Sequence, residues 1–432
     1  MNELEKGTRI QTASGGELTV MEKLGEGGQG AVYKVDRNGT PLALKWYFMK
    51  KLKNPTEFYK NIENNIQEGP PTSAFLWPLE ITKYFQGSFG YLMELRPPEY
   101  KDFSRFLLAK ERFANLGAVI QAALSITSGF QELHSRGYSY QDLNDGNFFV
   151  NPENGNVLIC DNDNVAPYKK GLGIAGKCRY MAPEVVRGKK PPDIHTDRFS
   201  LAVVLYRLLF LDHPLEGKRT MSPCLTEELE QRFYGTEPIF VWDPAIDTNR
   251  PVRGQHSNEI RLWPIYPEFV RKTFEKALSQ EAMIGADTEH RVTEKEWQNV
   301  FIRLRDSVIT CECGGETFID LSSSQSKCVN CGATIERPLM MKIKQYSIAL
   351  APGKHLYSCH VKAYNDDYAE IMGEIVHSRN DAAIVGLKNL SGFGWEAILP
   401  NGARKSVESG ATVRLMKGLK MNFGNGNAGE IY

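Results

Sequence analysis

The stretch YSYQDLNDGNFFVNPENGNVLICDND, from Tyr138 to Asp163, constrains this 432-residue chain more than any other. It places one acid, Asp142, five residues before an amide, Asn147, and a second acid, Asp161, follows two strand-like runs joined by a turn. In phosphoryl transfer, one carboxylate orients a hydroxyl nucleophile while an amide and a second carboxylate hold Mg²⁺ against ATP phosphates. The stretch therefore predicts a site that carries the groups this chemistry needs.

Length and composition limit the number of domains and the classes of partner. A chain of 432 residues is too long for one ordinary core, which predicts two or three domains. The 52 basic and 52 acidic side chains balance, so no net charge attracts nucleic acid or anionic lipid. The longest apolar run, residues 201–211, is shorter than the roughly 20 residues of a membrane span. Scattered cysteines without a secretory pattern favour a reducing, cytoplasmic location, and we expect neither membrane nor nucleic acid as partner.

The order of the expected elements indicates two lobes. Residues 17–48 alternate apolar and polar side chains around glycines, which predicts a β-meander with a hairpin at Asn38-Gly39. Residues 56–67 have a helical pattern, and strand-like runs follow at 79–85 and 89–95. From Phe103 onward the periodicity becomes helical. We therefore expect a ligand cleft between a β-rich lobe and an α-rich lobe.

A glycine loop lies between the first long strands. The sequence GEGGQGAV runs from Gly25 through Gly27 and Gly30 to Val32. Glycines let backbone N–H groups approach phosphates, and Val32 can cover an adenine. The same pattern also opens dinucleotide folds and occurs in plain hairpins, but here no helical pattern follows it. Lys45, on the next expected strand, would reach the α- and β-phosphates.

In this order, these motifs resemble the eukaryotic-type (Hanks-type) protein kinase family over about residues 15–305. The resemblance implies a bilobal fold, ATP and Mg²⁺ (or Mn²⁺) as cofactors and a protein as substrate. It implies catalytic roles for Asp142, Lys45 and Asn147, magnesium ligation by Asn147 and Asp161, and nucleotide contacts from Gly25, Gly27, Gly30, Val32, Ala43, Lys45, Glu63, Met93, Glu94, Leu95 and Phe149.

Some of these assignments depend on neighbouring residues. We prefer Glu63 over Glu57 and Glu68 as the helix carboxylate that pairs with Lys45, because the apolar positions around it fit that helix best. Met93 resembles the gatekeeper, and Glu94 and Leu95 would offer hinge backbone to adenine. RYMAPE, residues 179–184, resembles the end of the activation segment. Glu184 is then expected to pair with Arg291, and Asp197 to brace the catalytic loop.

The family's His-Arg-Asp motif reads Tyr140-Gln141-Asp142 here. The missing arginine normally grips a phosphorylated activation loop. No Ser or Thr lies between Asp161 and Glu184 either. We therefore predict activity that does not depend on Ser/Thr phosphorylation of this loop.

A second departure involves two positions that normally touch the catalytic aspartate. The expected lysine is Asn144 and the expected threonine is Lys177, so we predict that Lys177 returns a positive charge from the opposite stretch as a catalytic residue. Asp-Phe-Gly is replaced by Asp161-Asn162-Asp163. Because these substitutions spare the main groups expected to touch ATP or metal, an active enzyme is favoured. The overall resemblance implies Ser/Thr acceptors, although the lysine and the threonine that usually mark them are the residues replaced. The alternative is a pseudokinase-like nucleotide-binding scaffold that acts through its C-terminal modules.

Several segments after residue 197 narrow the resemblance. HPLEG at 213–217, GTEP at 235–238 and NRP at 249–251, with SYQDLNDGN and LICDNDN, resemble the kinase of bacterial tellurite-resistance-associated phosphorylation triads. That association implies a metal-dependent protein phosphatase and a von Willebrand factor A protein as partners.

Four cysteines form a separate module. Cys311-x-Cys313 and Cys328-x-x-Cys331 present four thiolates on glycine-flanked turns, which suits tetrahedral Zn²⁺ in a segment too small for its own core. An iron–sulfur site or a disulfide pair remains an alternative. Few basic residues lie nearby, which favours a folding element or docking module over nucleic-acid binding.

The tail, with GLKNLSGFGWEAILPNG and LKMNFG, resembles the second half of a forkhead-associated (FHA) β-sandwich. Arg379, Ser378 and Asn401 are candidate phosphothreonine contacts, while Trp395 stands near an expected polar position. The predicted fold class is α+β: a bilobal kinase-like domain at 1–305 (lobes 1–95 and 96–305), a zinc ribbon at 306–338 and an FHA-like all-β sandwich at 339–432.

Overall fold

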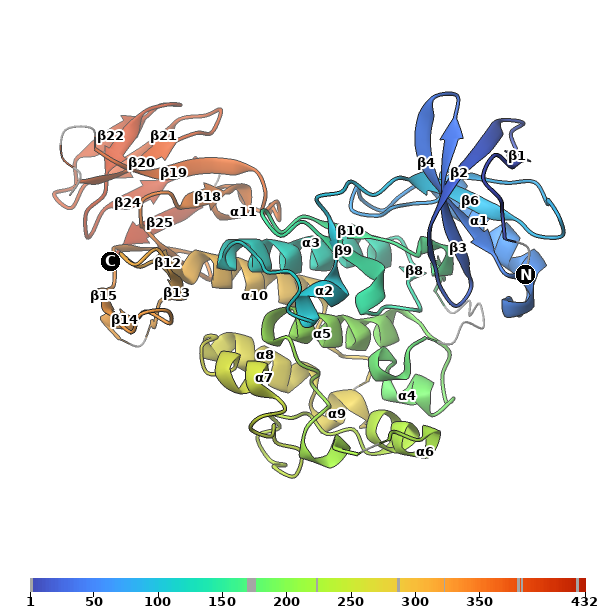
Figure 1. The fold of residues 1–432 in the computed structure, drawn as a ribbon. Helices are drawn as coiled ribbons and strands as arrows, with labels where there is room; N and C mark the ends of the chain where they lie inside the picture. Colours follow the sequence, from blue (N-terminus) through green and yellow to red (C-terminus); the bar gives the residue numbers. More distant parts are fainter. Residues whose placement is uncertain are drawn as a thin grey trace. The chain divides into compact units, whose positions relative to one another are not determined.

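The computed structural model describes residues 3–168, 176–222, 224–285, 288–321, 323–378, 381, 384–424 and 427–432 (Figure 1). The chain forms two compact units. The first comprises Met1–Pro264 with Arg271–Gln298, and the second Ile265–Val270 with Asn299–Tyr432. No helix in the described ranges is both long and apolar enough to cross a membrane.

The first unit begins with a six-stranded antiparallel sheet and one long helix. The strand order is β1 (Arg9–Gln11), β2 (Glu17–Glu26), β3 (Gly30–Arg37), β4 (Thr40–Tyr47), β6 (Gly90–Glu94) and β5 (Glu80–Ile81). The hairpin predicted at Asn38-Gly39 is confirmed: both residues have positive φ, 53° and 85°, as its tight turn requires. Helix α1 (Pro55–Glu68) starts at the cap Asn54 and ends before Gly69.

Helices dominate the rest of the first unit, as the periodicity predicts. They are α2 (Phe103–Leu107), α3 (Leu116–Ser135), α4 (Pro183–Val186), α5 (Ile194–Phe210), α6 (Glu227–Glu230), α7 (Ser257–Leu262), α8 (Glu268–Ala277), α9 (Gln280–Met283) and α10 (Glu294–Ser307). Thirteen of the 17 residues of α5 are buried, so this helix forms the centre of the lobe. Helices α8 and α10 each contribute residues to both units.

Short strands and single helical turns carry the predicted site. Strands β7 (Lys101–Asp102), β9 (Phe148–Val150) and β10 (Val157–Ile159) form one small sheet, and β8 (Tyr138–Ser139) pairs with β11 (Ala166–Pro167). The helical turns are η1 (Met49–Lys51), η2 (Asp145–Asn147), η3 (Asn162–Asn164), η4 (Cys178–Tyr180), η5 (Lys218–Thr220) and η6 (Gln231–Thr236). The loop-strand-turn-strand order predicted for 138–163 is confirmed.

The second unit is mainly β-structure. Two short hairpins pair β12 (Val308–Thr310) with β13 (Glu316–Phe318), and β14 (Gln325–Lys327) with β15 (Thr334–Glu336). A six-stranded sheet follows in the order β17 (Tyr346–Ala349), β16 (Met340–Ile343), β25 (Ala428–Ile431), β24 (Lys420–Asn422), β21 (Trp395–Ile398) and β22 (Arg404–Val407). A four-stranded sheet contains β18 (His355–Tyr357), β19 (Ile371–His377), β20 (Val385–Asn389) and β23 (Thr412–Arg414), and α11 (Ser358–Val361) follows β18.

The last turns of α10 pack with this β-structure. Lys354 Nζ donates to the carbonyl oxygen of Arg305 at 2.7 Å, and the Arg305 guanidinium lies 3.4 Å from the centroid of the Tyr357 ring. These contacts explain why the residues from Asn299 onward group with the second unit, although our predicted domain boundary falls after residue 305.

Candidate active site

The catalytic loop after β8 is held by a buried carboxylate of α5. Asp197 accepts backbone N–H groups from Tyr140 at 2.5 Å and Gln141 at 3.1 Å, so its predicted bracing role is confirmed. His134 contacts both Asp197 and Glu294, at 3.2 and 2.9 Å. Burial opposes protonation of His134, but these two carboxylates outweigh it and raise the pKa of His134 to about 9. An ionised cluster therefore anchors the loop.

Tyr140, which replaces the family's histidine, positions the predicted metal-binding amide. Its hydroxyl is fully buried, contacts the carbonyl oxygen of Cys160 and accepts the Asn147 side-chain N–H at 3.0 Å. The Cys160 N–H donates in turn to the Asn147 backbone carbonyl at 2.9 Å. The amide oxygen of Asn147 is its acceptor atom and hence the one that can act as a metal ligand, and the hydrogen bond from Nδ2 to Tyr140 fixes the orientation of the amide.

Asp142 lies in an electrostatically strained position. Burial, with the nearby charge of Asp161, raises the pKa of Asp142 to about 6, although Asn144, Lys177 and Lys45 each oppose the shift. Asn144 Nδ2 donates to Asp142 Oδ1 at 3.1 Å, which fixes the carboxylate. A base with a pKa near the working pH suits proton transfer.

Lys177 lies in this site, but its ion pair is made with a neighbour of Asp142. Its ammonium is 3.0 Å from Asp145 Oδ1, and Arg207 Nη1 donates to the other oxygen of Asp145 at 3.1 Å. The structure thus places a cation beside the catalytic loop from the opposite stretch of chain. Its charge acts on Asp142 through space rather than through a direct bond.

Lys45 is the main departure from the predicted geometry. Its ammonium lies 2.8 Å from Asp161 Oδ1 and 2.9 Å from Asp163 Oδ2. Within the described ranges, Glu63 is not among its carboxylate partners, which corrects our choice of Glu63 as the lysine's helix partner. Glu63 is half-buried near Tyr59, where its charge adds to burial in raising the pKa of that phenol.

The physical reason for this difference is that asparagines, rather than a glutamate, occupy the buried face of α1. Asn61 and Asn65, one helical turn apart, are fully buried and occupy that face. Asn61 Nδ2 donates to the carbonyl oxygen of Val165 at 2.7 Å, and Asn65 Nδ2 donates to the same oxygen at 3.0 Å. The helix therefore meets the segment after Asp161 through amides rather than through a carboxylate.

The predicted adenine-binding residues come together. Ala43 on β4 pairs with Met93 on β6, and both belong to one apolar cluster against which Val32, Leu95 and Phe149 pack. Glu94, at the end of β6, is exposed. Residues of both lobes therefore contribute to this apolar cluster.

The glycine loop has room for a ligand. A Cβ added at Gly25 or Gly27 meets nothing within 4 Å, and neither residue has positive φ, so packing does not demand glycine there. Gly30 differs, since its Cβ would lie 2.2 Å from the Trp46 carbonyl oxygen. Glycine at 25 and 27 is therefore required neither by packing nor by a left-handed backbone conformation.

Comparison with known proteins agrees with this geometry. The family model described as "Protein kinase domain" matches residues 18–296. The chain belongs to the protein kinase family. It is 27% identical over 254 residues to "Probable serine/threonine-protein kinase SIS8" of Arabidopsis thaliana, covering 53% of this chain and 22% of that protein.

Two further relatives align with this chain over shorter stretches than the Arabidopsis protein does. It is 33% identical over 118 residues to "Rhodopsin kinase GRK1" of Rattus norvegicus (26% of this chain, 20% of the relative). It is 26% identical over 231 residues to "Ribosomal protein S6 kinase 2 alpha" of Xenopus laevis (51% and 31%). The matches thus span less than a third of each relative's length.

The end of the activation segment is anchored as predicted. Arg291 donates to both carboxylate oxygens of Glu184, at 2.8 and 2.9 Å, and both side chains are buried. This bidentate pair has the geometry of a strong ion pair. Residues 169–175 of the segment lie outside the described residues.

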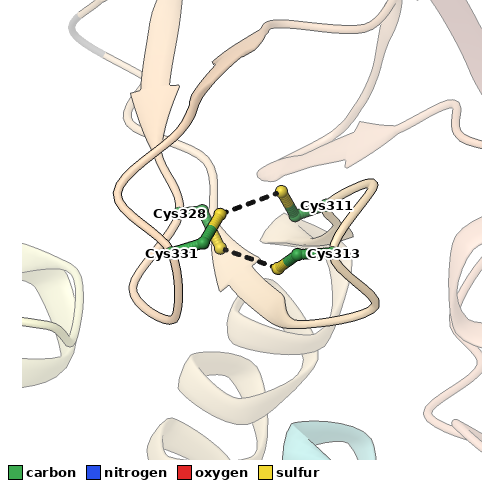
Figure 2. Close-up of side chains that lie close together, drawn as sticks. All are labelled: Cys311, Cys313, Cys328 and Cys331. Carbon is green, nitrogen blue, oxygen red and sulfur yellow. Dashed lines mark hydrogen bonds between the residues drawn. The ribbon is translucent and has the colours of Figure 1, made fainter.

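Figure 2 shows the four cysteines of the second unit facing one another. Their sulfur atoms all lie within 4.8 Å; Cys311 and Cys331 are 3.8 Å apart, and Cys313 and Cys328 3.7 Å. A tetrahedral ion with sulfur ligands at about 2.3 Å has sulfur–sulfur edges of about 3.8 Å, whereas a disulfide bond is about 2.05 Å. Asn330 N–H donates to the Cys328 sulfur at 3.4 Å, as thiolates need. The geometry therefore fits one zinc ion.

The buried polar groups behind Lys45 were not predicted from the sequence. They are Tyr47, Asn61, Asn65, Tyr91 and Asp163. Two signals could have found some of them: asparagines four residues apart on the apolar face of a helix, and a second acid two residues after Asp161. Buried polar groups are hydrogen-bonded, so such a pattern predicts a partner across the cleft.

Proposed function

We propose that this kinase transfers the γ-phosphoryl group of ATP to a serine or threonine hydroxyl of a protein. The observation that carries the proposal is the 2.8 Å contact between Lys45 of the β-rich lobe and Asp161. The charge of Asp161 also contributes to the raised pKa of Asp142. A phosphate-binding cation, a metal ligand and a base are thereby gathered in one cleft.

The residues fit the groups that the reaction needs. The amide oxygen of Asn147 and the carboxylate of Asp161 are hard oxygen ligands of the kind Mg²⁺ prefers. Mg²⁺, when bound, would neutralise charge on the phosphate oxygens. Lys45 and the glycine loop would hold phosphates, and Lys177 would add positive charge at the acceptor side. Asp142 would orient the acceptor hydroxyl and receive its proton.

A small hollow next to Asp142 supports the position that we propose for the acceptor hydroxyl. Its lining includes Gly176, Lys177, Met181 and Ser200. A Cβ at Gly176 would lie only 3.2 Å from Asp142 Oδ1, so glycine keeps the approach to the carboxylate open. We infer that the acceptor hydroxyl approaches Asp142 from this side.

We further propose that the activation segment needs no phosphate for its order. Arg179 donates to both oxygens of Glu216 at 2.5 and 2.7 Å, and His213 Nε2 contacts the Arg179 carbonyl oxygen at 2.9 Å. Arg207 contacts the Tyr180 hydroxyl. These contacts anchor Arg179 and Tyr180, at the end of the segment, without a phosphate. Phosphatase-treated enzyme should keep its full activity, and an activating phosphate found by mass spectrometry in residues 161–184 would contradict this.

For the second unit we propose a structural zinc site and an FHA-like interaction module. Support comes from the four-sulfur geometry and from the two sheets of β16–β25. Of the candidate phosphothreonine contacts, Arg379 lies outside the described residues, and Asn401 accepts the Ala403 N–H at 3.0 Å. Trp395 is buried. Membership of the bacterial triads, with phosphatase and von Willebrand factor A partners, stays a prediction that co-purification can test.

Radiolabelled transfer from ATP to the enzyme itself or to a general acceptor tests the activity. Wild type and Asp142→Asn are compared at several Mg²⁺ and Mn²⁺ concentrations, with nucleotide affinity measured separately on both. We expect transfer by wild type only. Equal, background transfer together with retained nucleotide binding would instead support the scaffold alternative.

A further inference from the structure

Asp163, two residues after the predicted metal ligand Asp161, is a fully buried carboxylate. Its Oδ1 accepts from Lys45 Nζ at 3.0 Å and from the Tyr91 hydroxyl at 3.3 Å. Its Oδ2 lies 2.9 Å from the same ammonium and accepts from the Tyr47 hydroxyl. Both oxygens are therefore satisfied by groups of β4 and β6.

The two aspartates beside Lys45 have different surroundings. The side chain of Asp161 is 43% exposed, whereas that of Asp163 is 0% exposed. An exposed carboxylate can turn to a metal ion, but a buried one that accepts three hydrogen-bonding groups cannot leave them cheaply. Asp163 is thus the partner that keeps Lys45 when Asp161 is engaged elsewhere.

Helix α1 is tied to the same turn through neutral groups. Asn61 Nδ2 donates to the backbone carbonyl of Asp163 at 3.4 Å, and Asn65 Nδ2 to that of Asn162 at 3.4 Å. The turn η3, strand β4 and helix α1 therefore meet without any carboxylate from the helix.

We propose that Asp163 is the residue that positions Lys45 for phosphate binding, in place of a carboxylate on α1. The proposal rests on the proposed function, because it assigns Lys45 to the phosphates. Since Asp161 and Asp163 belong to one short turn, folding of that turn sets both the metal ligand and the lysine. Helix α1 then acts on Lys45 only indirectly, through the hydrogen bonds of Asn61 and Asn65 to the backbone of that turn.

The first test measures kcat and KM for ATP with Asp163→Asn, in the wild type and in the Lys45→Met background. A misplaced phosphate contact can lower a rate by roughly 100-fold. We expect kcat/KM to fall by about that factor in the wild type, with a KM for ATP raised at least threefold, and by less than threefold in Lys45→Met. Loss of folded enzyme alone would lower the apparent kcat and leave KM unchanged.

The second test needs no nucleotide and follows thermal unfolding of the full chain. Asp163→Asn should lower the Tm of wild type, because Lys45 loses a buried partner, and raise the Tm of Lys45→Met, because an unpaired buried charge is removed. Glu63→Gln should shift Tm equally in both backgrounds. Additive effects of Asp163→Asn, or coupling of Lys45 to Glu63 instead, would overturn the assignment.

The two tests separate two kinds of failure. A wild type that transfers no phosphate would refute the proposed function, and the unfolding cycle would still decide which carboxylate pairs with Lys45. If the wild type is active, kcat/KM of Asp163→Asn lies within threefold of the wild-type value and kcat/KM of Glu63→Gln falls strongly, only the role of Asp163 would be refuted.

Discussion

The ionised form of Asp142 destabilises the folded protein, and replacing Asp142 by Asn should reveal by how much. Burial and the charge of Asp161 raise the pKa of Asp142 to about 6. Against an ordinary value of about 3.9, the shift is roughly 2 units, or about 3 kcal/mol at 1.36 kcal/mol per unit. The folded state holds the proton more tightly than the unfolded chain. Stability is therefore lost as pH rises from about 4 to 6 and stays lower above pH 6.

Asn at position 142 has the same shape, carries no charge and can still accept the Asn144 amide. About half of the difference, roughly 1.4 kcal/mol, should develop between pH 5 and pH 8. Thermal unfolding of wild type and Asp142→Asn should therefore diverge with rising pH, the variant gaining a few degrees in Tm while losing phosphoryl transfer.

Asp145→Asn gives a matched comparison, because it removes a carboxylate of the same loop that is paired with Lys177 and Arg207. That variant should lose stability at pH 8 rather than gain it. A Tm difference between wild type and Asp142→Asn that is constant from pH 5 to pH 8, or a variant less stable at pH 8, would refute the reasoning.

We place the acid limb of the pH profile of kcat/KM near pH 6, where Asp142 titrates. Lys177→Ala should move this limb to higher pH, because Lys177 lowers the pKa of Asp142. A limb at the same pH in both proteins would contradict the role of Lys177 in the site. Gly30→Ala should lower Tm by several degrees, because its Cβ would lie 2.2 Å from a backbone oxygen. Gly27→Ala should fold normally but bind ATP more weakly. Equal Tm values for Gly30→Ala and Gly27→Ala would contradict this difference between the two glycines. Cys328→Ser should remove about one equivalent of zinc, measured by elemental analysis, and lower the stability of the second unit; undiminished zinc would exclude Cys328 as a ligand.

Features with a local chemical signature were predictable from the sequence. The hairpin at Asn38-Gly39 follows from two residues that accept positive φ, and the Cys₄ cluster follows from ligand spacing alone. The pair of Glu184 with Arg291 followed from the family resemblance, and the contacts confirm it. For the hairpin and the cysteine cluster, the local sequence carries the geometry with little help from the rest of the chain, whereas the Glu184–Arg291 pair joins distant positions and needed the family pattern.

The partner of Lys45 could not be predicted in this way. Glu63 and Asp163 are both acids, and choosing between them requires knowing which side of α1 faces the cleft. The apolar pattern of α1 leaves that side ambiguous, because Asn61 and Asn65 are polar yet buried. Their burial is favourable only because backbone carbonyls of residues 162–165 are there to accept from them, and those lie about 100 residues away in sequence.

The departures from the family pattern share one physical consequence. Tyr140, in the place of the family's histidine, accepts from Asn147; Lys177 brings a cation where Asn144 stands in place of the expected lysine; and Asp163 supplies Lys45 with a carboxylate. Electrostatic stabilisation of a transition state depends on where charges and dipoles lie, not on which element carries them. Two charged groups that the family pattern would provide are thus supplied from other positions in the chain, the cation by Lys177 and the partner of Lys45 by Asp163. The paired replacements therefore favour an active enzyme over a silent scaffold, and they place the change in how the site is held together.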